Sequence, residues 1–98
     1  MTYRLVLRTR VRADIESAAS WYEGEREGLG AECVAAVDQA LTAVERLPLR
    51  YPPVHKQVRR ALVVRFPYAV FFVLERDRVV VLAVLHQAAD PASWPGRL

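Results

Sequence analysis

The fold is decided by residues 58–94, which read VRRALVVRFPYAVFFVLERDRVVVLAVLHQAADPASW. Three consecutive runs in this stretch are rich in β-branched and aromatic residues, the composition of strands. The runs are Val58 to Arg65, Tyr68 to Glu75 and Val79 to His86. Pro67 separates the first two runs, and Arg76-Asp77 has the length of a two-residue hairpin turn between the last two. The stretch therefore predicts a meander of three antiparallel strands.

The residues that precede the meander predict one further strand and a first helix. From Tyr3 to Arg8, the apolar Tyr3, Leu5 and Leu7 alternate with Arg4, Val6 and Arg8, which is the period of a half-buried strand. Thr9 can cap a following helix. The apolar positions of that helix have helical spacing and are Val11, Ile15, Ala18, Ala19 and Tyr22. This face of the helix is expected to lie on the sheet.

A second helix follows a glycine-rich break and packs beside the first. Gly28-Leu29-Gly30 predicts a turn or helix boundary, because two glycines lie within three residues. The next apolar stripe consists of Val34, Val37, Leu41 and Val44, and the helix is expected to end at Leu47-Pro48. Pro48, Pro52 and Pro53 then predict an extended or turning loop before the meander. Two helices joined by a short turn form an antiparallel hairpin.

Length and composition indicate a single domain over residues 1–98. The chain is 53% hydrophobic, which is enough to bury a core and excludes a disordered linker. Cys33 is the one cysteine, so an internal disulfide is impossible and a cytoplasmic location is expected. Cys33 is interpreted as a core residue of the second helix and not as a nucleophile. Residues 1–8 carry arginines within their apolar run, so no export signal is expected there. No membrane span is expected either, because no apolar run approaches the roughly 20 residues that it needs.

Charge is distributed unevenly along the chain. Eight of the eleven acidic residues lie between Arg10 and Arg46, whereas no acidic residue lies between positions 46 and 74. The basic residues of that second stretch are Arg46, Arg50, Lys56, Arg59, Arg60 and Arg65. One end of the domain should therefore be positive, which suits phosphate, RNA or an acidic protein. A solvated basic face is the alternative interpretation.

The last two strands are apolar on both faces, which has a consequence for partners. The runs AVFFVL and VVVLAVL are typical of central strands that are covered on both sides. The helical hairpin can cover one face of the sheet, and only the short tail remains for the other. Apolar surface is therefore expected to be available to a partner protein.

Several motifs in this order resemble the ParE branch of the RelE/ParE toxins, the bacterial toxins of type II toxin–antitoxin and plasmid stabilisation systems. The motifs are ADIESAASWYE and GLGAECVAAVDQAL in the hairpin, RRALVVRFPYAVFF in the meander and HQAADPASWPGR in the tail. The resemblance implies an α+β fold with an N-terminal strand, an antiparallel helical hairpin and a small, mostly antiparallel sheet. It also implies a toxin that inhibits DNA gyrase without catalysis and is neutralised by a cognate antitoxin.

Target contacts are expected from the basic strand and from the tail. The candidate target-binding residues are Arg59, Arg60, Arg65, His86, Asp90, Trp94 and Arg97. His86 and Asp90 match the family's tail, but Gln87-Ala88-Ala89 stands where the family usually carries an arginine. The departure implies either a weakened or inactive member that retains only antitoxin binding, or a charge supplied by Arg97 and Arg65.

The alternative function is a RelE-like, ribosome-dependent messenger endoribonuclease. Such a reaction needs an acid or base and cations that stabilise the phosphorane. His86 could be the acid or base, Arg60 or Arg65 could hold the phosphate, and Lys56 could stabilise charge. No metal site and no cofactor are predicted, because Cys/His clusters and glycine-rich phosphate loops are absent from the sequence. Trp21, Tyr22 and Trp94 are interpreted as core or partner contacts.

Overall fold

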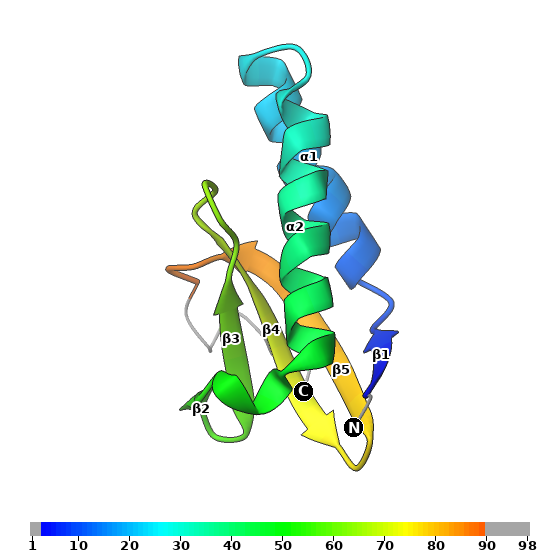
Figure 1. The fold of residues 1–98 in the computed structure, drawn as a ribbon. Coiled ribbons are helices and arrows are strands. Elements are labelled where there is room, and N and C mark those ends of the chain that lie inside the picture. The colour runs from blue at the N-terminus through cyan, green and yellow to red at the C-terminus, as the bar shows by residue number, and fades with distance from the viewer. Residues whose placement is uncertain (1–2, 90–98) are drawn as a thin grey trace.

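Two helices lie on one face of a five-stranded sheet in the computed structural model, which describes residues 3–89 (Figure 1). The strands are β1 (Arg4–Leu7), β2 (Pro53–His55), β3 (Val58–Leu62), β4 (Tyr68–Glu75) and β5 (Arg78–His86). The helices are α1 (Val11–Glu25), α2 (Leu29–Arg46) and a short 3-10 helix, η1 (Pro48–Arg50). Among these described elements, no helix is long and apolar enough to cross a membrane.

The sheet is mostly antiparallel, and its two longest strands lie at its centre. Its strand order is β1-β5-β4-β3-β2. The meander β3-β4-β5 is antiparallel, whereas β1 pairs with β5 in parallel. Arg76-Asp77 forms the predicted turn between β4 and β5, with Arg76 at φ 59°. The predicted α+β fold, with its N-terminal strand, helical hairpin and C-terminal meander, is confirmed.

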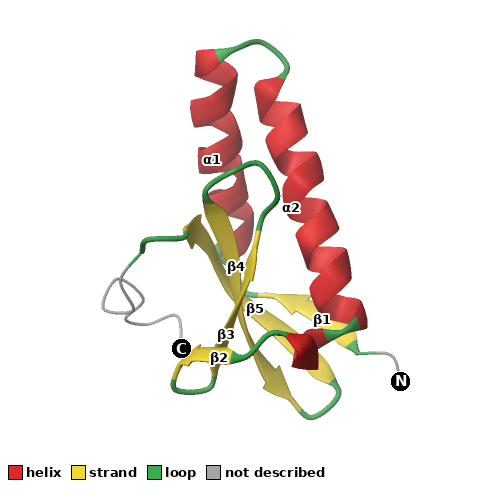
Figure 2. Cartoon of the chain, turned by 60° about the vertical axis from the view of Figure 1, so that its left-hand side comes forward, coloured by secondary structure: helices red, strands yellow, loops and turns green. Residues whose placement is uncertain are grey.

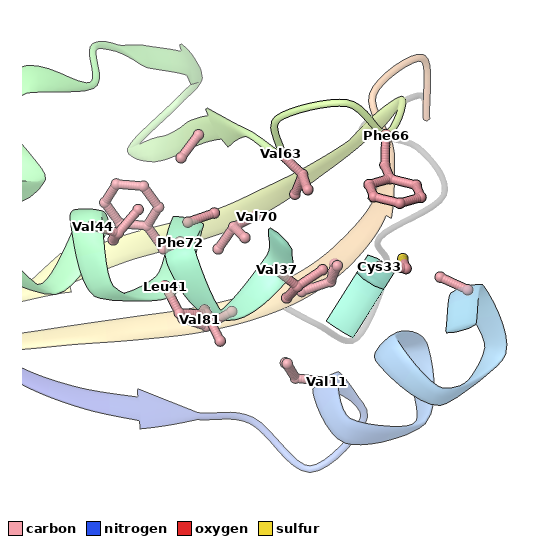
Figure 3. Close-up of a cluster of buried hydrophobic side chains, with 14 of the residues drawn as sticks. Val11, Cys33, Val37, Leu41, Val44, Val63, Phe66, Val70, Phe72 and Val81 are labelled. Atoms are coloured by element: carbon pink, nitrogen blue, oxygen red, sulfur yellow. The ribbon is translucent and has the colours of Figure 1, made fainter. Parts of the chain in front are cut away.

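The main core lies between the helices and the sheet (Figure 3). Val37 and Val44 of α2 pack with Phe72 of β4 and Val81 of β5, and all four side chains are fully buried. Cys33 is part of this core, as predicted, and burial raises the pKa of its thiol. A raised pKa leaves little thiolate, which is the nucleophilic form of cysteine.

The second face of the sheet corrects the expectation of an open apolar surface there. Its side chains form a cluster of their own and are at most 2% exposed: Val58, Ala69, Phe71, Val80, Leu82 and Ala83. Val6, Val73 and Leu85 pack against this cluster. Leu62, which pairs with Ala69, lies at the margin of this face and is 55% exposed. Other large exposed apolar side chains of the described residues lie elsewhere, among them Trp21 on α1 and Val64 in the β3–β4 loop.

Two local predictions were wrong, and a third was incomplete. Thr9 does not cap α1: the N-cap is Arg10, because the backbone turns at Arg8, whose carbonyl accepts a hydrogen bond from Val11 N. The third strand ends at Leu62 and not at Arg65, since Val63 N bonds to the Tyr68 carbonyl and closes the loop to β4. The proline loop contains η1 and the edge strand β2, which begins at Pro53, a position that proline tolerates.

A short turn joins α1 to α2 (Figure 2). A carboxylate from α1 holds this turn. Glu23 accepts hydrogen bonds from the backbone N–H groups of Gly28 (3.0 Å) and Gly30 (2.9 Å) at the start of α2. Gly28 has φ 86°, a backbone conformation that glycine adopts without strain. Gly30 lies so close to α1 that a Cβ atom there would be 2.7 Å from the Ala19 carbonyl oxygen. The predicted turn is thus confirmed, with its hydrogen bonds identified.

Candidate functional site

Polar and aromatic side chains gather at one end of the sheet, which we call the rim. They come from four segments far apart in the sequence: α1, the start of α2, the β3–β4 loop with the start of β4, and the end of β5. The rim comprises Trp21, Tyr22, Glu32, Arg65, Phe66, Tyr68 and His86. Two of these residues, Arg65 and His86, were predicted as site residues.

His86 is exposed at the end of β5, opposite Tyr68 in the strand register. The two rings meet edge to face, with centroids 5.9 Å apart. The Nδ1 atom of His86 accepts a hydrogen bond from Ala88 N (3.1 Å), and the His86 carbonyl accepts one from Ala89 N (2.8 Å). Gln87 N bonds to the Pro67 carbonyl (2.9 Å), so the chain after β5 is tied to the loop before β4.

Arg65 lies in the β3–β4 loop and reaches the helical hairpin. Its backbone has φ 77°, which is uncommon for a residue with a side chain. Its guanidinium donates to Glu32 Oε1 at 2.9 Å and lies 5.5 Å from the centroid of the Phe66 ring. Glu32 also receives a 3.3 Å hydrogen bond from Arg26. The hydrogen bond from Arg65 lowers the pKa of the Glu32 carboxyl below its ordinary value.

Aromatic rings connect the hairpin to this loop. Tyr22 meets Phe66 edge to face at 4.9 Å and Tyr68 at 6.2 Å, and Trp21 packs on Tyr22 at 4.9 Å. Desolvation, followed by the nearby Tyr68, raises the pKa of the Tyr22 hydroxyl. Tyr22 packs against the core, as predicted, whereas Trp21 is 60% exposed and available for a partner.

The remaining predicted site residues do not join the rim. Lys56 lies in the turn between β2 and β3, at the start of β3, whereas Arg65 lies beyond the end of that strand. A five-residue strand is about 13 Å long, so Lys56 is well separated from Arg65 and His86. Arg59 donates to the Tyr51 carbonyl (2.6 Å), and Arg60 lies opposite Phe71 in mid-strand. The structure therefore does not assemble the four residues predicted for a ribonuclease.

The tail residues Asp90, Trp94 and Arg97 lie outside the described residues. Within residues 3–89, no group of three His, Cys, Asp or Glu side chains could hold a metal ion.

A groove between α1, α2 and the end of β1 is a second candidate surface, with a volume of about 420 Å³. Its apolar lining consists of Leu7, Ile15, Ala19, Val34 and Leu41, and Arg12, Glu16 and Asp38 complete it. The apolar stripes predicted for the two helices include Ile15, Val34 and Leu41. Ile15 and Val34 are only partly buried, because they lie at the margin of those stripes. The apolar stripes of α1 and α2 are wide enough in the sequence to extend past the sheet. Their width was the signal that could have identified the groove.

Comparison with known proteins agrees with this architecture. No curated protein is significantly similar in sequence. The solved structures that share the fold include two toxin–antitoxin systems. The chromosomal ParDE toxin–antitoxin system from P. aeruginosa contains a chain with a TM-score of 0.78 and 13% identity, covering 87% of this chain and 96% of that one. The RelBE2 toxin–antitoxin complex from Mycobacterium tuberculosis contains one with a TM-score of 0.66 and 22% identity, covering 88% and 99%.

A family model shows more than the fold. The model described as the ParE toxin of the type II toxin–antitoxin system, parDE, matches residues 5–91, which include α1, α2, most of β1, the other four strands and the rim. The chain belongs to the family of ParE toxins of type II toxin–antitoxin systems.

Proposed function

We propose that this toxin inhibits DNA gyrase by protein–protein contact and that a cognate antitoxin neutralises it. One observation carries the choice of contact over catalysis. Lys56 lies at the opposite end of β3 from Arg65 and His86, so the groups that a ribonuclease would use are not gathered at one place. The exposed side chains at the rim are instead Trp21, Arg65 and His86, which suit contact with a protein.

The rim has few groups free for acid–base chemistry. The Nδ1 atom of His86 is engaged by the backbone of Ala88, and the Glu32 carboxylate is engaged by two arginines. A positioned general acid or base contributes about 10²–10⁴-fold to a rate, and RNA cleavage by a 2′-hydroxyl needs both. This arrangement disfavours the ribonuclease alternative.

The test measures both activities with the same purified toxin. Increasing toxin should inhibit negative supercoiling of a relaxed plasmid by reconstituted gyrase, and the antitoxin should restore supercoiling. In a translating extract, the same toxin should leave ribosome-bound messages intact. Message cleavage that is lost in His86→Ala, together with unaffected gyrase, would replace this proposal with the ribonuclease alternative.

For the antitoxin, we propose that an amphipathic helix docks in the groove between α1 and α2. Val34 and Ile15 supply an apolar floor that such a helix can cover, while Arg12 and Asp38 supply charges at its margin. Calorimetry with purified antitoxin should give at least micromolar affinity, which corresponds to about −8 kcal/mol. Val34→Glu should weaken binding more than tenfold, whereas Val54→Glu, an exposed apolar site on β2, should leave it unchanged. Equal effects of the two variants would contradict docking in the groove.

The tail carries a separate proposal about the strength of the toxin. The Ala88-Ala89 pair stands where the family that the chain resembles tends to carry an arginine, and it follows His86 of the rim after one intervening residue. If the missing charge weakens target binding, Ala89→Arg should increase growth inhibition and leave antitoxin affinity nearly unchanged. Paired expression from a tightly repressed promoter, with plating efficiency as the readout, tests this. Equal toxicity at equal protein level would show that the missing charge is irrelevant.

A further inference from the structure

We propose that Arg65 is the anchor for a side-chain carboxylate of the protein target, and that Glu32 occupies this anchor until the target displaces it. The inference rests on the proposed function, because it assigns the chemistry by which the rim recognises its target.

The position of Arg65 is set by its backbone before any partner arrives. The loop between β3 and β4 is closed by hydrogen bonds from Val63 N to the Tyr68 carbonyl (2.9 Å) and from Tyr68 N to the Phe66 carbonyl (2.7 Å). Within this loop Arg65 has φ 77°. Non-glycine residues in this region are uncommon and are found disproportionately at binding and switch sites. The loop thus presents the arginine in one defined direction.

The guanidinium of Arg65 is already arranged for a carboxylate. It lies over the Phe66 ring, 5.5 Å from its centroid, and donates to Glu32 at 2.9 Å. The Arg65 side chain is still 60% exposed, so part of its planar fork of donors faces solvent. Glu32 therefore shows which group this anchor binds, and the hydrogen bond from Arg65 lowers the pKa of its carboxyl.

The pairing between Glu32 and Arg65 can be exchanged at little cost. Both side chains are substantially exposed, at 38% and 60%, and ion pairs of this kind contribute little to stability. Glu32 also retains a second partner in Arg26 when it releases Arg65, since that contact is 3.3 Å long. A carboxylate delivered by a docked protein would be removed from solvent by the interface around it, so its Coulomb attraction to Arg65 would be stronger than that of the exposed Glu32.

The surroundings favour a protein over a nucleic acid. Trp21, Tyr22 and Tyr68 lie beside the Arg65 loop, and Trp, Tyr and Arg are the residue types enriched in protein interface hot spots. The adjacent hairpin tip carries Glu25 and Glu27, both exposed. A run of phosphates would be repelled by these carboxylates, whereas a single carboxylate on an apolar partner surface can reach Arg65 alone.

The experiment compares five variants in direct binding to reconstituted DNA gyrase by biolayer interferometry. Glu32→Gln should bind gyrase about 2- to 5-fold more tightly than the wild type, because the competing charge is gone. Arg65→Ala and Arg65→Lys should bind at least 10-fold more weakly. The double variant Glu32→Gln/Arg65→Ala should match Arg65→Ala, since Glu32 acts only through Arg65. Glu27→Gln, a carboxylate on the same hairpin, is the matched control and should match the wild type.

The sign of the Glu32→Gln effect separates the inference from a structural role. If the ion pair only braces the loop, Glu32→Gln weakens binding and lowers the melting temperature, and the inference is overturned. An unchanged affinity overturns it as well, as does an equal gain in the Glu27→Gln control. If wild-type toxin fails to bind gyrase at all, the proposed function fails and takes this inference with it. If the wild type binds gyrase but Glu32→Gln does not bind it more tightly, the inference fails while the proposed function stands.

Discussion

The two halves of the helical hairpin are held by different forces. The half near the sheet is fixed by apolar burial, with Val37 and Val44 of α2 packed on Phe72. The other half projects beyond the sheet (Figures 1 and 2) and is fixed by close backbone approach at Gly30 and by the Glu23 carboxylate. A helix pair without a sheet beneath it has little apolar surface to bury. It therefore needs hydrogen bonds and close backbone contacts of its own.

This difference matters for function because part of the rim lies on the projecting half. Tyr22 and Glu32 lie on that half, and they receive Phe66 and Arg65 from the β3–β4 loop. Their position depends on the packing of α1 against α2, and only indirectly on the core. Damage to the core should therefore lower global stability, whereas damage to the tip should disturb the rim first.

The largest effect is expected in the half that packs on the sheet. Phe72→Ala removes a fully buried ring from the main core and should lower the free energy of unfolding by about 3–5 kcal/mol. Urea unfolding followed by circular dichroism measures this change. Leu62→Ala, at a side chain that is 55% exposed on β3, is the control and should change stability by at most about 0.5 kcal/mol. Similar losses for both variants would contradict a core centred on Phe72.

An intermediate effect is expected where α1 and α2 approach each other. Gly30→Ala places a Cβ atom 2.7 Å from the Ala19 carbonyl oxygen, so the helices must separate, at a cost of about 1–3 kcal/mol. Gly24→Ala is the matched control in α1, because a Cβ atom there meets nothing within 4 Å. That substitution should stabilise the protein by about 0.5–1 kcal/mol. The same urea titrations decide this, and a loss of stability in both variants would argue against a close contact at Gly30.

The smallest effect is expected from the carboxylate at the tip, and it depends on pH. Hydrogen bonds from Gly28 and Gly30 lower the pKa of Glu23 in the folded state. The stabilisation is therefore present above the unfolded-state pKa and is lost as the pH falls through the lower folded-state pKa. Glu23→Gln should melt a few degrees below the wild type at pH 7, and the difference should shrink by pH 3. Melting curves at several pH values test this.

Glu25→Gln supplies the control for that titration, because Glu25 is exposed on the same turn of α1. It should follow the wild-type melting temperature at every pH. A gap between Glu23→Gln and the wild type that stays constant from pH 7 to pH 3 would show that charge is not the cause. Of the two interactions described at the tip, only the close contact at Gly30 would then remain supported.

The apolar half of the molecule could be predicted from the sequence, because buried positions recur as apolar residues at the regular spacing of a helix or strand. Tyr68–Glu75 has the predicted bounds, and the last strand begins one residue earlier than predicted, at Arg78. The parallel pairing of β1 with β5 was not predicted, since alternation identifies the faces of a strand but not its neighbour. The edge strand β2 was missed because Pro53 and its short length resemble a loop.

The rim was predicted only in part, for a related reason. Arg65 and His86 were identified by residue type and by their place at the ends of strands. Glu32 was not identified, because its contact with Arg65 joins distant segments and leaves no periodicity in the sequence. Lys56 was grouped with them because it belongs to the same basic stretch of sequence as Arg65. The sequence does not reveal that β3 separates Lys56, before the strand, from Arg65, after it.

The pairing of β1 with β5 sets an order of events during synthesis. The helical hairpin joins neighbours in the chain and can form early, whereas the sheet cannot close until β5 has left the ribosome. The rim depends on the same strand, since His86 is its last residue. A nascent or truncated chain that lacks β5 should therefore have no complete rim. Interrupted synthesis of this toxin should release fragments that cannot harm the cell.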